Sequence, residues 1–383
     1  MVVNSRHNQL LFFLCSISLI LLNFYFGPSI SSDTFTYLKW LTKLESVGFS
    51  FPVYHEGLNH GFVYIFYDFF LLYLWFIKFI FQESWQTGFF VLNQIYLGLC
   101  LFMLLKLSLK ALDDLAVNIF LIALIFLSLD FFVWPRFILS EGLFLLLFTS
   151  CLYCYSKSFI LKDNSKLFLP YIAACFFFLA LFSKPGSIGV LSGLIFFHMI
   201  SFLKPVYKDS IFKILIIIII IIAPIIYEFI IDQILSSDNY KITQLISYAQ
   251  SGFVVDGRPT TFLNDQSLAT IYLYRFFYFF FPIVPELSIL HKSLDLAFSI
   301  IFFLSLIIWG IFSSQYTRMF QDLCKLMFLV FTFSALFHSA TLIDYDWRYR
   351  FPSLIPMILF IIYNFYEVRR IIHDRSSYSS IQN

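Results

Sequence analysis

The chain has 383 residues, of which 60% are hydrophobic and only 13% are charged, and its formal net charge is +2. Soluble domains carry roughly 25% charged residues, so this chain has too few polar side chains to cover a water-exposed surface, and a soluble fold is excluded. The small net charge and the lack of a basic patch interleaved with aromatics also exclude nucleic acid as a partner. The composition instead predicts a protein that lies in the lipid bilayer.

Apolar runs of about the length that a membrane-spanning helix needs, roughly 20 residues, recur from one end of the chain to the other. Helix is the predicted state of each run, because the backbone must satisfy its own hydrogen bonds in lipid. The runs cover residues 9–27, 62–82, 88–107, 115–134, 138–156, 168–183, 187–203, 211–232, 294–312, 322–342 and 352–368. They predict an all-α, polytopic transmembrane helical bundle of about 11–12 spans. We expect a single integral membrane domain over residues 1–383 with short extracytoplasmic loops.

Two further runs have a different pattern. Residues 33–50 mix apolar and polar side chains and predict an interfacial amphipathic helix within a first extracytoplasmic loop, residues 28–61. Residues 270–285 are rich in aromatics and can form a re-entrant segment, an interfacial segment or an extra crossing. They belong to a long extracytoplasmic loop, residues 233–293.

The basic residues predict which loops lie inside the cell. The first run follows Arg6 and His7, and no small-residue cleavage site follows it, so we predict a retained first span that begins inside. The inner loops are marked by Lys157, Lys162, Lys166, Lys204, Lys208, Lys213, Arg318, Lys325, Arg369, Arg370 and Arg375. Both termini are then inside, which an odd number of spans does not allow. One run between residues 62 and 134 is therefore predicted to be re-entrant, split in two or half-length.

Charged groups near a membrane face are costly unless they pair or perform a function, so those beside the predicted outer face are the candidates for chemistry. Asp33 follows the first span, and its carboxylate can act as a general base toward an incoming hydroxyl. The alternative is a helix N-cap, a position that Ser, Thr and Asp favour. Later in the same loop, His55, Glu56 and His60 either bind a divalent metal or form a solvated loop, and their spacing matches no metal-site pattern.

Two further candidates lie at predicted span ends. Arg136 and Glu141 flank the start of the run at 138–156, where they can face one cleft or form an ion pair. Lys184 precedes Pro185 and Gly186 between two spans. This segment predicts either a plain tight turn or a lysine directed at a phosphate.

The densest polar cluster lies before the last run, on the predicted outer side. It reads Asp344-Tyr345-Asp346-Trp347-Arg348-Tyr349-Arg350-Phe351-Pro352. Two arginines on this side run against the positive-inside bias, and arginine offers bidentate contacts to phosphate oxygens. The alternative is a structural knot of ion pairs beside an aromatic belt. Arg258 and Arg275 are further basic groups in the long outer loop.

The order of these landmarks resembles the GT-C superfamily of membrane glycosyltransferases. Within it, the chain looks most like the family of protein O-mannosyltransferases and the lipid A aminoarabinose transferase. Asp33, followed by Tyr37, matches an acidic residue in the first outer loop of that family. Arg136 and Glu141 match an arginine and acidic pair that opens a middle span. The element at 348–352 matches an Arg-Tyr-x-x-Pro-like element before a late span, and Lys184 matches a basic turn loosely.

The resemblance implies a glycosyltransferase that moves a sugar from a polyprenyl-phosphate donor to an acceptor at the extracytoplasmic face. Asp33 would be the catalytic base. The donor phosphate and substrate would be bound by Arg136, Glu141, Lys184, Arg348, Tyr349 and Arg350. Possible further contacts are Tyr37, Glu56, His60, Arg258 and Arg275. No cofactor is implied except, as an option, a divalent metal. We expect a bacterial inner membrane protein of cell-envelope glycan or glycolipid synthesis, with a glycan, a lipid or a protein as acceptor.

Two other functions compete with this interpretation. An O-antigen polymerase or ligase also has many spans, but it usually concentrates Arg and His in large outer loops, and the outer loops here are short. A non-catalytic transporter or flippase tends to have inverted repeats and charges near the middle of the membrane. No internal repeat is visible in the sequence, although Asp68 and Asp130 do lie inside apolar runs.

Overall fold

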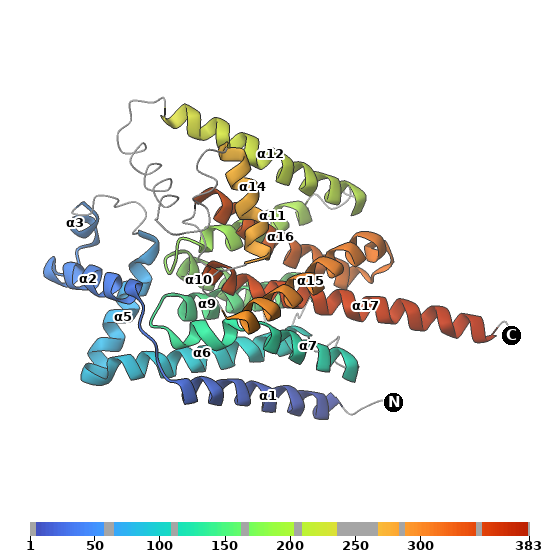
Figure 1. The fold of residues 1–383 in the computed structure, drawn as a ribbon, viewed down its shortest axis with the longest axis horizontal. Coiled ribbons are helices and arrows are strands. Elements are labelled where there is room, and N and C mark those ends of the chain that lie inside the picture. The colour runs from blue at the N-terminus through green and yellow to red at the C-terminus, as the bar shows by residue number, and fades with distance from the viewer. Residues whose placement is uncertain are drawn as a thin grey trace.

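The computed structural model describes residues 5–56, 65–108, 114–161, 168–202, 209–235, 267–282, 288–341 and 347–381 (Figure 1). Helix is the regular structure in these residues, apart from one isolated bridge between Ser29 and Phe137. The long helices of the bundle are α1 (Ser5–Phe26), α6 (Trp85–Ser108), α7 (Leu115–Leu127), α9 (Glu141–Tyr155), α10 (Leu169–Leu181), α11 (Ser187–Phe202), α12 (Asp209–Leu235), α15 (Ile289–Phe312), α16 (Arg318–Thr341) and α17 (Leu354–Ile381). The predicted all-α membrane bundle is therefore confirmed.

Shorter helices complete the described structure. They are α2 (Ser32–Ser46), α3 (Phe51–Glu56), η1 (Ile65–Tyr67), α5 (Asp68–Phe81), η2 (Gln82–Ser84), α8 (Asp130–Val133), η3 (Trp134–Arg136), η4 (Ser156–Ile160), α14 (Leu268–Phe280), η6 (Ser313–Gln315) and η7 (Trp347–Ser353). The aromatic run at 270–285 is represented by α14, which has 13 residues. A helix of that length is shorter than the roughly 20 residues of a full span.

Fewer helices are long enough to span a membrane than the 11–12 predicted. Among the described residues, seven segments are long and apolar enough, or eight if the bent pair formed by residues 115–127 and 130–136 counts as one span. In the described part, the other predicted spans are therefore represented by shorter helices. Two of the bundle helices, α10 and α11, are apolar but shorter, with 13 and 16 residues.

The irregularity predicted between residues 62 and 134 has two parts. Helix α5 has 14 residues and lies crosswise at the end of the bundle next to α2, away from the direction of α6 (Figure 1). Helices α7 and α8 meet at a 62° bend. With α5 crosswise, the remaining long helices run back and forth, and both termini lie at the same end of the bundle (Figure 1).

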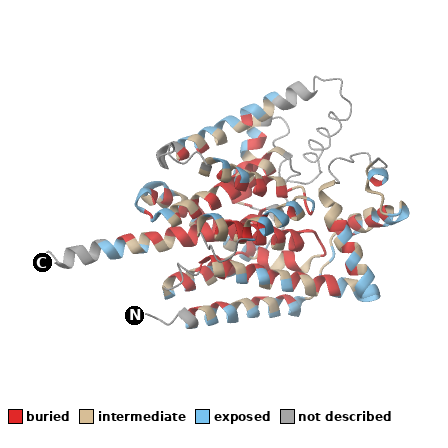
Figure 2. Cartoon of the chain, turned by 180° about the vertical axis from the view of Figure 1, so that it is seen from behind, coloured by how far each residue is buried: buried red, intermediate tan, exposed pale blue. Residues whose placement is uncertain are grey.

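The end of η7 and the first part of α17 form the centre of the core. Residues 350–364 are all buried, and Figure 2 shows this stretch in the middle of the bundle. Helix α1 lies at the periphery instead, because only 17% of its apolar window is buried. Its outward face is left for lipid.

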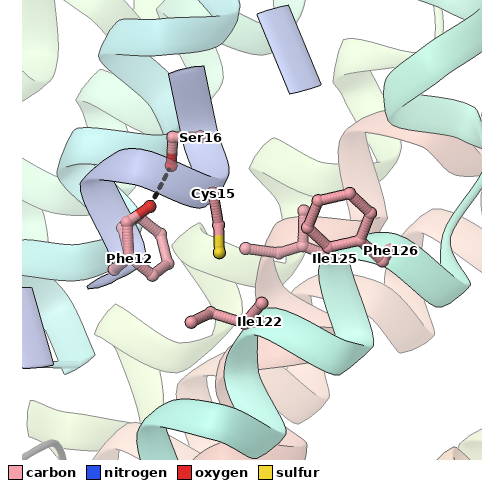
Figure 3. Close-up of a pocket in the computed structure, with 6 residues that line it drawn as sticks. All are labelled: Phe12, Cys15, Ser16, Ile122, Ile125 and Phe126. Carbon is pink, nitrogen blue, oxygen red and sulfur yellow. Dashed lines mark hydrogen bonds between the residues drawn. The ribbon is translucent and has the colours of Figure 1, made fainter. Parts of the chain in front are cut away.

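Helix α1 packs on α7 with a small void between them. Figure 3 shows the lining side chains, which are Phe12, Cys15, Ser16, Ile122, Ile125 and Phe126. The void measures about 10 Å³, and the Ser16 hydroxyl already donates a hydrogen bond to the Phe12 carbonyl at 2.9 Å. A water molecule needs roughly 10–15 Å³ and two or more polar partners, so this void is a packing defect and not a ligand site.

Candidate functional site

Two loops that are far apart in sequence are joined at the end of the bundle opposite the termini. The Ser29 amide donates to the Arg136 carbonyl at 2.9 Å, and the Ile138 amide donates to the Ser29 carbonyl at 3.2 Å. The Thr34 hydroxyl donates to the Ile138 carbonyl at 2.9 Å. These bonds fix the start of α2 against the segment that leads into α9. We call the pair of segments, residues 27–34 and 134–138, the loop junction.

Asp33 lies in the first turn of α2, at the loop junction, and is half-buried. The N-cap of α2 is Ser31, whose side chain accepts from the Thr34 amide while the Thr34 hydroxyl accepts from the Ser31 amide. The alternative interpretation of Asp33 as the helix cap is therefore wrong.

The amphipathic pattern of α2 explains its position. Thr34, Tyr37, Leu41 and Leu44 are buried and recur at intervals of three and four residues, so they form one face of the helix. Tyr37 lies against the Phe70 ring, with ring centroids 5.0 Å apart. Tyr37 thus packs between α2 and α5 and holds the first half of α2 in place.

Arg136 closes the C-terminal end of α1. Its Nε donates to the Gly27 carbonyl at 3.0 Å, and one Nη donates to the Phe26 carbonyl and the Ser29 hydroxyl, both at 3.3 Å. The last carbonyls of a helix have no partner within the helix and favour a nearby cation. Arg136 therefore stabilises the loop junction, and it does not pair with Glu141.

Glu141 forms a buried ion pair with Lys184, which sequence reasoning had considered separately. The Lys184 ammonium lies 2.5 Å from Glu141 Oε1, and both side chains are nearly inaccessible, at 2% and 1% exposure. Gly186 continues the turn, and a Cβ placed there would meet the His338 ring at 3.2 Å. The starts of α9 and α11 and the end of α16 therefore converge on one buried polar patch.

Arg350 is the centre of a second buried cluster. One of its Nη atoms donates to Asp295 Oδ1 at 2.7 Å and to Asp130 Oδ2 at 3.0 Å, and its side chain is 1% exposed. Trp134 Nε1 donates to Asp130 Oδ1 at 2.9 Å. His291 Nε2 lies 3.5 Å from Asp295 Oδ2. Two carboxylates, one guanidinium and one imidazole thus meet inside the membrane part of the bundle.

The bend after α7 is what brings Asp130 into this cluster. Side-chain amides satisfy the carbonyls that the bend releases from helical bonding: Asn23 Nδ2 donates to Phe131, Gln94 Nε2 to Pro135 and Asn93 Nδ2 to Phe137, at 2.9–3.2 Å. Non-helical backbone is tolerated at membrane depth only when it is paired in this way.

Sequence reasoning missed Asp295 and His291. Both lie in the first two turns of α15, at or beside the start of an apolar run. The available signal was their spacing, because residues four apart share a helix face, and a carboxylate inside an apolar helix calls for a partner.

The remaining predicted residues are dispersed or lie outside the described part. Arg275 is buried on α14, with 8% exposure. The backbone of Arg348 and Tyr349 belongs to η7, and that of Glu56 ends α3. His60, Arg258, Asp344 and Asp346 lie outside the described residues.

The loop that suggested a metal site is joined to α5 by a hydrogen bond. His55 Nε2 lies 3.0 Å from Asp68 Oδ2, which joins α3 to the start of α5. Within the described ranges, no three His, Cys, Asp or Glu side chains are placed to hold a metal ion.

Comparison with known proteins adds no assignment: no family model, curated protein or solved structure matches this chain. The site is thus defined by its own geometry. A half-buried carboxylate on an amphipathic helix is fixed at the same end of the bundle as two buried clusters that contain cations.

Proposed function

We propose that the chain is a membrane glycosyltransferase that moves a sugar from a polyprenyl-phosphate donor to an acceptor hydroxyl at the extracytoplasmic face. The observation that carries the proposal is the position of Asp33. It lies on an amphipathic helix at the bundle end, and it is held by the loop junction beside the start of α9. A carboxylate at the edge of a membrane domain can meet a lipid-borne substrate from the bilayer and an acceptor from water.

The proposed reaction is a single displacement. The acceptor oxygen attacks the anomeric carbon, and the bond from that carbon to the phosphate oxygen breaks. Asp33 takes the acceptor's proton as general base, and polyprenyl phosphate leaves with the electron pair. Positive groups near the leaving oxygen would stabilise the charge that develops on it.

Arg350 is the described cation best suited to that last role. One Nη holds both aspartates, whereas Nε and the other Nη have no hydrogen-bond partner among the described residues, although they are buried. Buried donors of this kind are costly unless a partner satisfies them. A phosphate oxygen would be such a partner. Lys184 and Arg136 would support the site through Glu141 and the loop junction.

A second candidate is transport of an ion or small solute. It is favoured by the bend between α7 and α8 and by the Asp130–Arg350–Asp295 cluster, because broken helices and charges within the membrane are common in transporters. Transport requires no general base on α2. The role of Asp33 therefore separates the two candidates.

The test compares cells that carry the wild-type chain with cells that carry Asp33→Asn. We expect transfer to fall at least about 100-fold, since general-base catalysis contributes roughly 10²–10⁴-fold, and polyprenyl-phosphate sugar to accumulate in lipid extracts. Glu45→Gln is the matched control, because Glu45 is exposed at the other end of α2. Normal donor levels in Asp33→Asn cells, with the variant present in the membrane, would reject the proposal.

A further inference from the structure

A cavity of about 310 Å³ lies at the end of the bundle opposite the loop junction, between α11, α12 and α16. Tyr316, which lines the cavity, directly follows η6. Segment η6 contacts the second half of α17, where Arg370 donates to the Gln315 carbonyl at 3.0 Å. This is the end that carries both termini (Figure 1), and the basic residues predict it to be the inner side. The volume reaches the lower range of small-molecule sites, roughly 300–1,000 Å³.

The polar part of the lining has an excess of positive charge. Arg318 and Lys325 contribute two cations, and Asp322 contributes one carboxylate. All three lie on α16, where positions 318, 322 and 325 share one face. Arg318 is exposed and forms no ion pair with a described residue. The cavity therefore presents a guanidinium that is available to an anion.

The other part of the lining is apolar and continues into surface that faces lipid. Phe197 and Phe212 are buried in the wall, and the Lys325 ammonium lies 5.5 Å from the centroid of the Phe212 ring. Beyond Phe212, α12 exposes Ile214, Ile217 and Ile221, each more than half accessible. An occupant with a phosphate and an acyl chain could place the first in the cavity and the second along α12.

We propose that this cavity binds the headgroup phosphate of an anionic glycerophospholipid from the inner leaflet. Basic pockets between membrane helices on the cytoplasmic side are suited to such headgroups, and arginine forms charge-assisted hydrogen bonds to phosphate oxygens. The site shares no residue with the proposed transferase site. Its occupant would fasten α11, α12 and α16 to one another and so stabilise the inner half of the bundle.

The test uses the purified full chain in dodecyl maltoside and measures the midpoint of thermal unfolding. The protein is titrated with dihexanoyl phosphatidylglycerol, with dihexanoyl phosphatidylcholine and with inorganic phosphate at constant ionic strength. A ligand that binds the folded state raises the midpoint with its concentration. We expect phosphatidylglycerol to raise it, and the other two compounds to have little effect at the same concentration.

Three variants test whether the rise in the unfolding midpoint comes from binding in this cavity. Arg318→Gln should raise the half-saturating concentration of phosphatidylglycerol about tenfold, because a charge-assisted contact to phosphate is lost. Ser201→Phe should abolish the response by filling the cavity without changing charge, since Ser201 lines it. Lys106→Gln should respond like the wild type, because Lys106 is at the end of α6 and lines no part of the cavity.

Several results would overturn the proposal. An equal shift with inorganic phosphate would assign the cavity to a soluble phosphate compound instead of a lipid. Equal shifts with both lipids would show that charge is not recognised. No shift with phosphatidylglycerol, or an unchanged titration in Arg318→Gln, would show that the cavity is not its binding site.

Discussion

Arg350 carries a positive charge into the interior of the bundle, where it meets two carboxylates. Its side chain is 1% exposed, and those of Asp130 and Asp295 are 0% and 3% exposed. Removing one partner of a buried ion pair leaves an uncompensated charge in a medium that solvates it poorly. The cluster therefore behaves as a unit, and its members should not be replaceable one at a time.

We expect Arg350→Gln to destabilise the protein by about 3–5 kcal/mol, since it strands two buried carboxylates. The measurement is the free energy of unfolding in mixed detergent micelles. Adding Asp130→Asn and Asp295→Asn to the same chain should recover most of the loss, because the cluster then holds no uncompensated carboxylate.

Arg369→Gln is the control for this prediction. Arg369 pairs with Asp114 at 2.8 Å, but its side chain is 46% exposed, so the loss should be no more than about 1 kcal/mol. Equal losses in the two arginine variants would show that the buried ion pairs of Arg350 affect stability no more than an exposed pair does.

At the scale of single helices, α2 depends on the capping box between Ser31 and Thr34. We expect Ser31→Ala to cost about 1 kcal/mol, because it removes the acceptor of the Thr34 amide. Asp33→Asn should cost less than half of that, since Asp33 is not the cap. Unfolding midpoints of the two variants check this. A larger loss in Asp33→Asn would mean that any loss of its activity reflects folding instead of base catalysis.

Helices α11 and α16 approach closely because two glycines four residues apart lie in their contact. A Cβ at Gly193 would come within 2.6 Å of the Leu329 carbonyl oxygen and the Val330 Cα, and one at Gly189 within 2.9 Å of the Ser334 Cα. Small residues at this spacing let membrane helices pack backbone to backbone. The spacing was visible in the sequence, but it does not reveal which helix is the partner.

Gly193→Ala should therefore destabilise the protein by about 1–3 kcal/mol, because the obstructing atoms belong to backbone that has to shift. Gly310→Ala provides the comparison within α15, since a Cβ there meets nothing within 4 Å. It should be neutral, or stabilising by up to about 1 kcal/mol. The free energy of unfolding should thus be lower than that of the wild type in Gly193→Ala and equal or higher in Gly310→Ala. Equal values in the two variants would refute the close α11–α16 contact.

At the scale of the whole molecule, the sequence predicted those features that depend on the character of one run of residues alone. Apolar runs located every long helix of the described part, because lipid demands helix from any such run. They indicated an irregular run between residues 62 and 134 but did not reveal that α5 lies crosswise or that α7 bends before Asp130. The bend depends on side chains of other helices, because Asn23 and Gln94 satisfy the carbonyls that follow it. The sequence predicted individual residues of the candidate site but not which of them pair with each other. The partners are too far apart in the chain for spacing to indicate them: Lys184 and Glu141 are 43 positions apart, and Arg350 and Asp130 are 220 apart.

The arrangement also predicts which ends of the helices face the two sides of the membrane. With α5 crosswise, the long helices alternate in direction and return the C-terminus to the end where α1 begins (Figure 1). The basic residues Lys213, Arg318, Lys325 and Arg369 belong to this end, which the positive-inside bias assigns to the cytoplasm. Helix α2 and Asp33 then face outside, as the proposed transferase requires.

Single cysteines in a chain whose six native cysteines are replaced by alanine test this orientation in intact cells. We expect a membrane-impermeant maleimide to label Lys39→Cys directly, because Lys39 is exposed on α2, which the proposed orientation places outside. His7→Cys and Asp374→Cys, exposed near the two ends of the chain, should react only after the membrane is permeabilised. Labelling of His7→Cys and Asp374→Cys from opposite sides would mean an odd number of crossings and would contradict the helix order. Labelling of both from outside would place Asp33 in the cytoplasm, and an extracytoplasmic transferase would then be excluded.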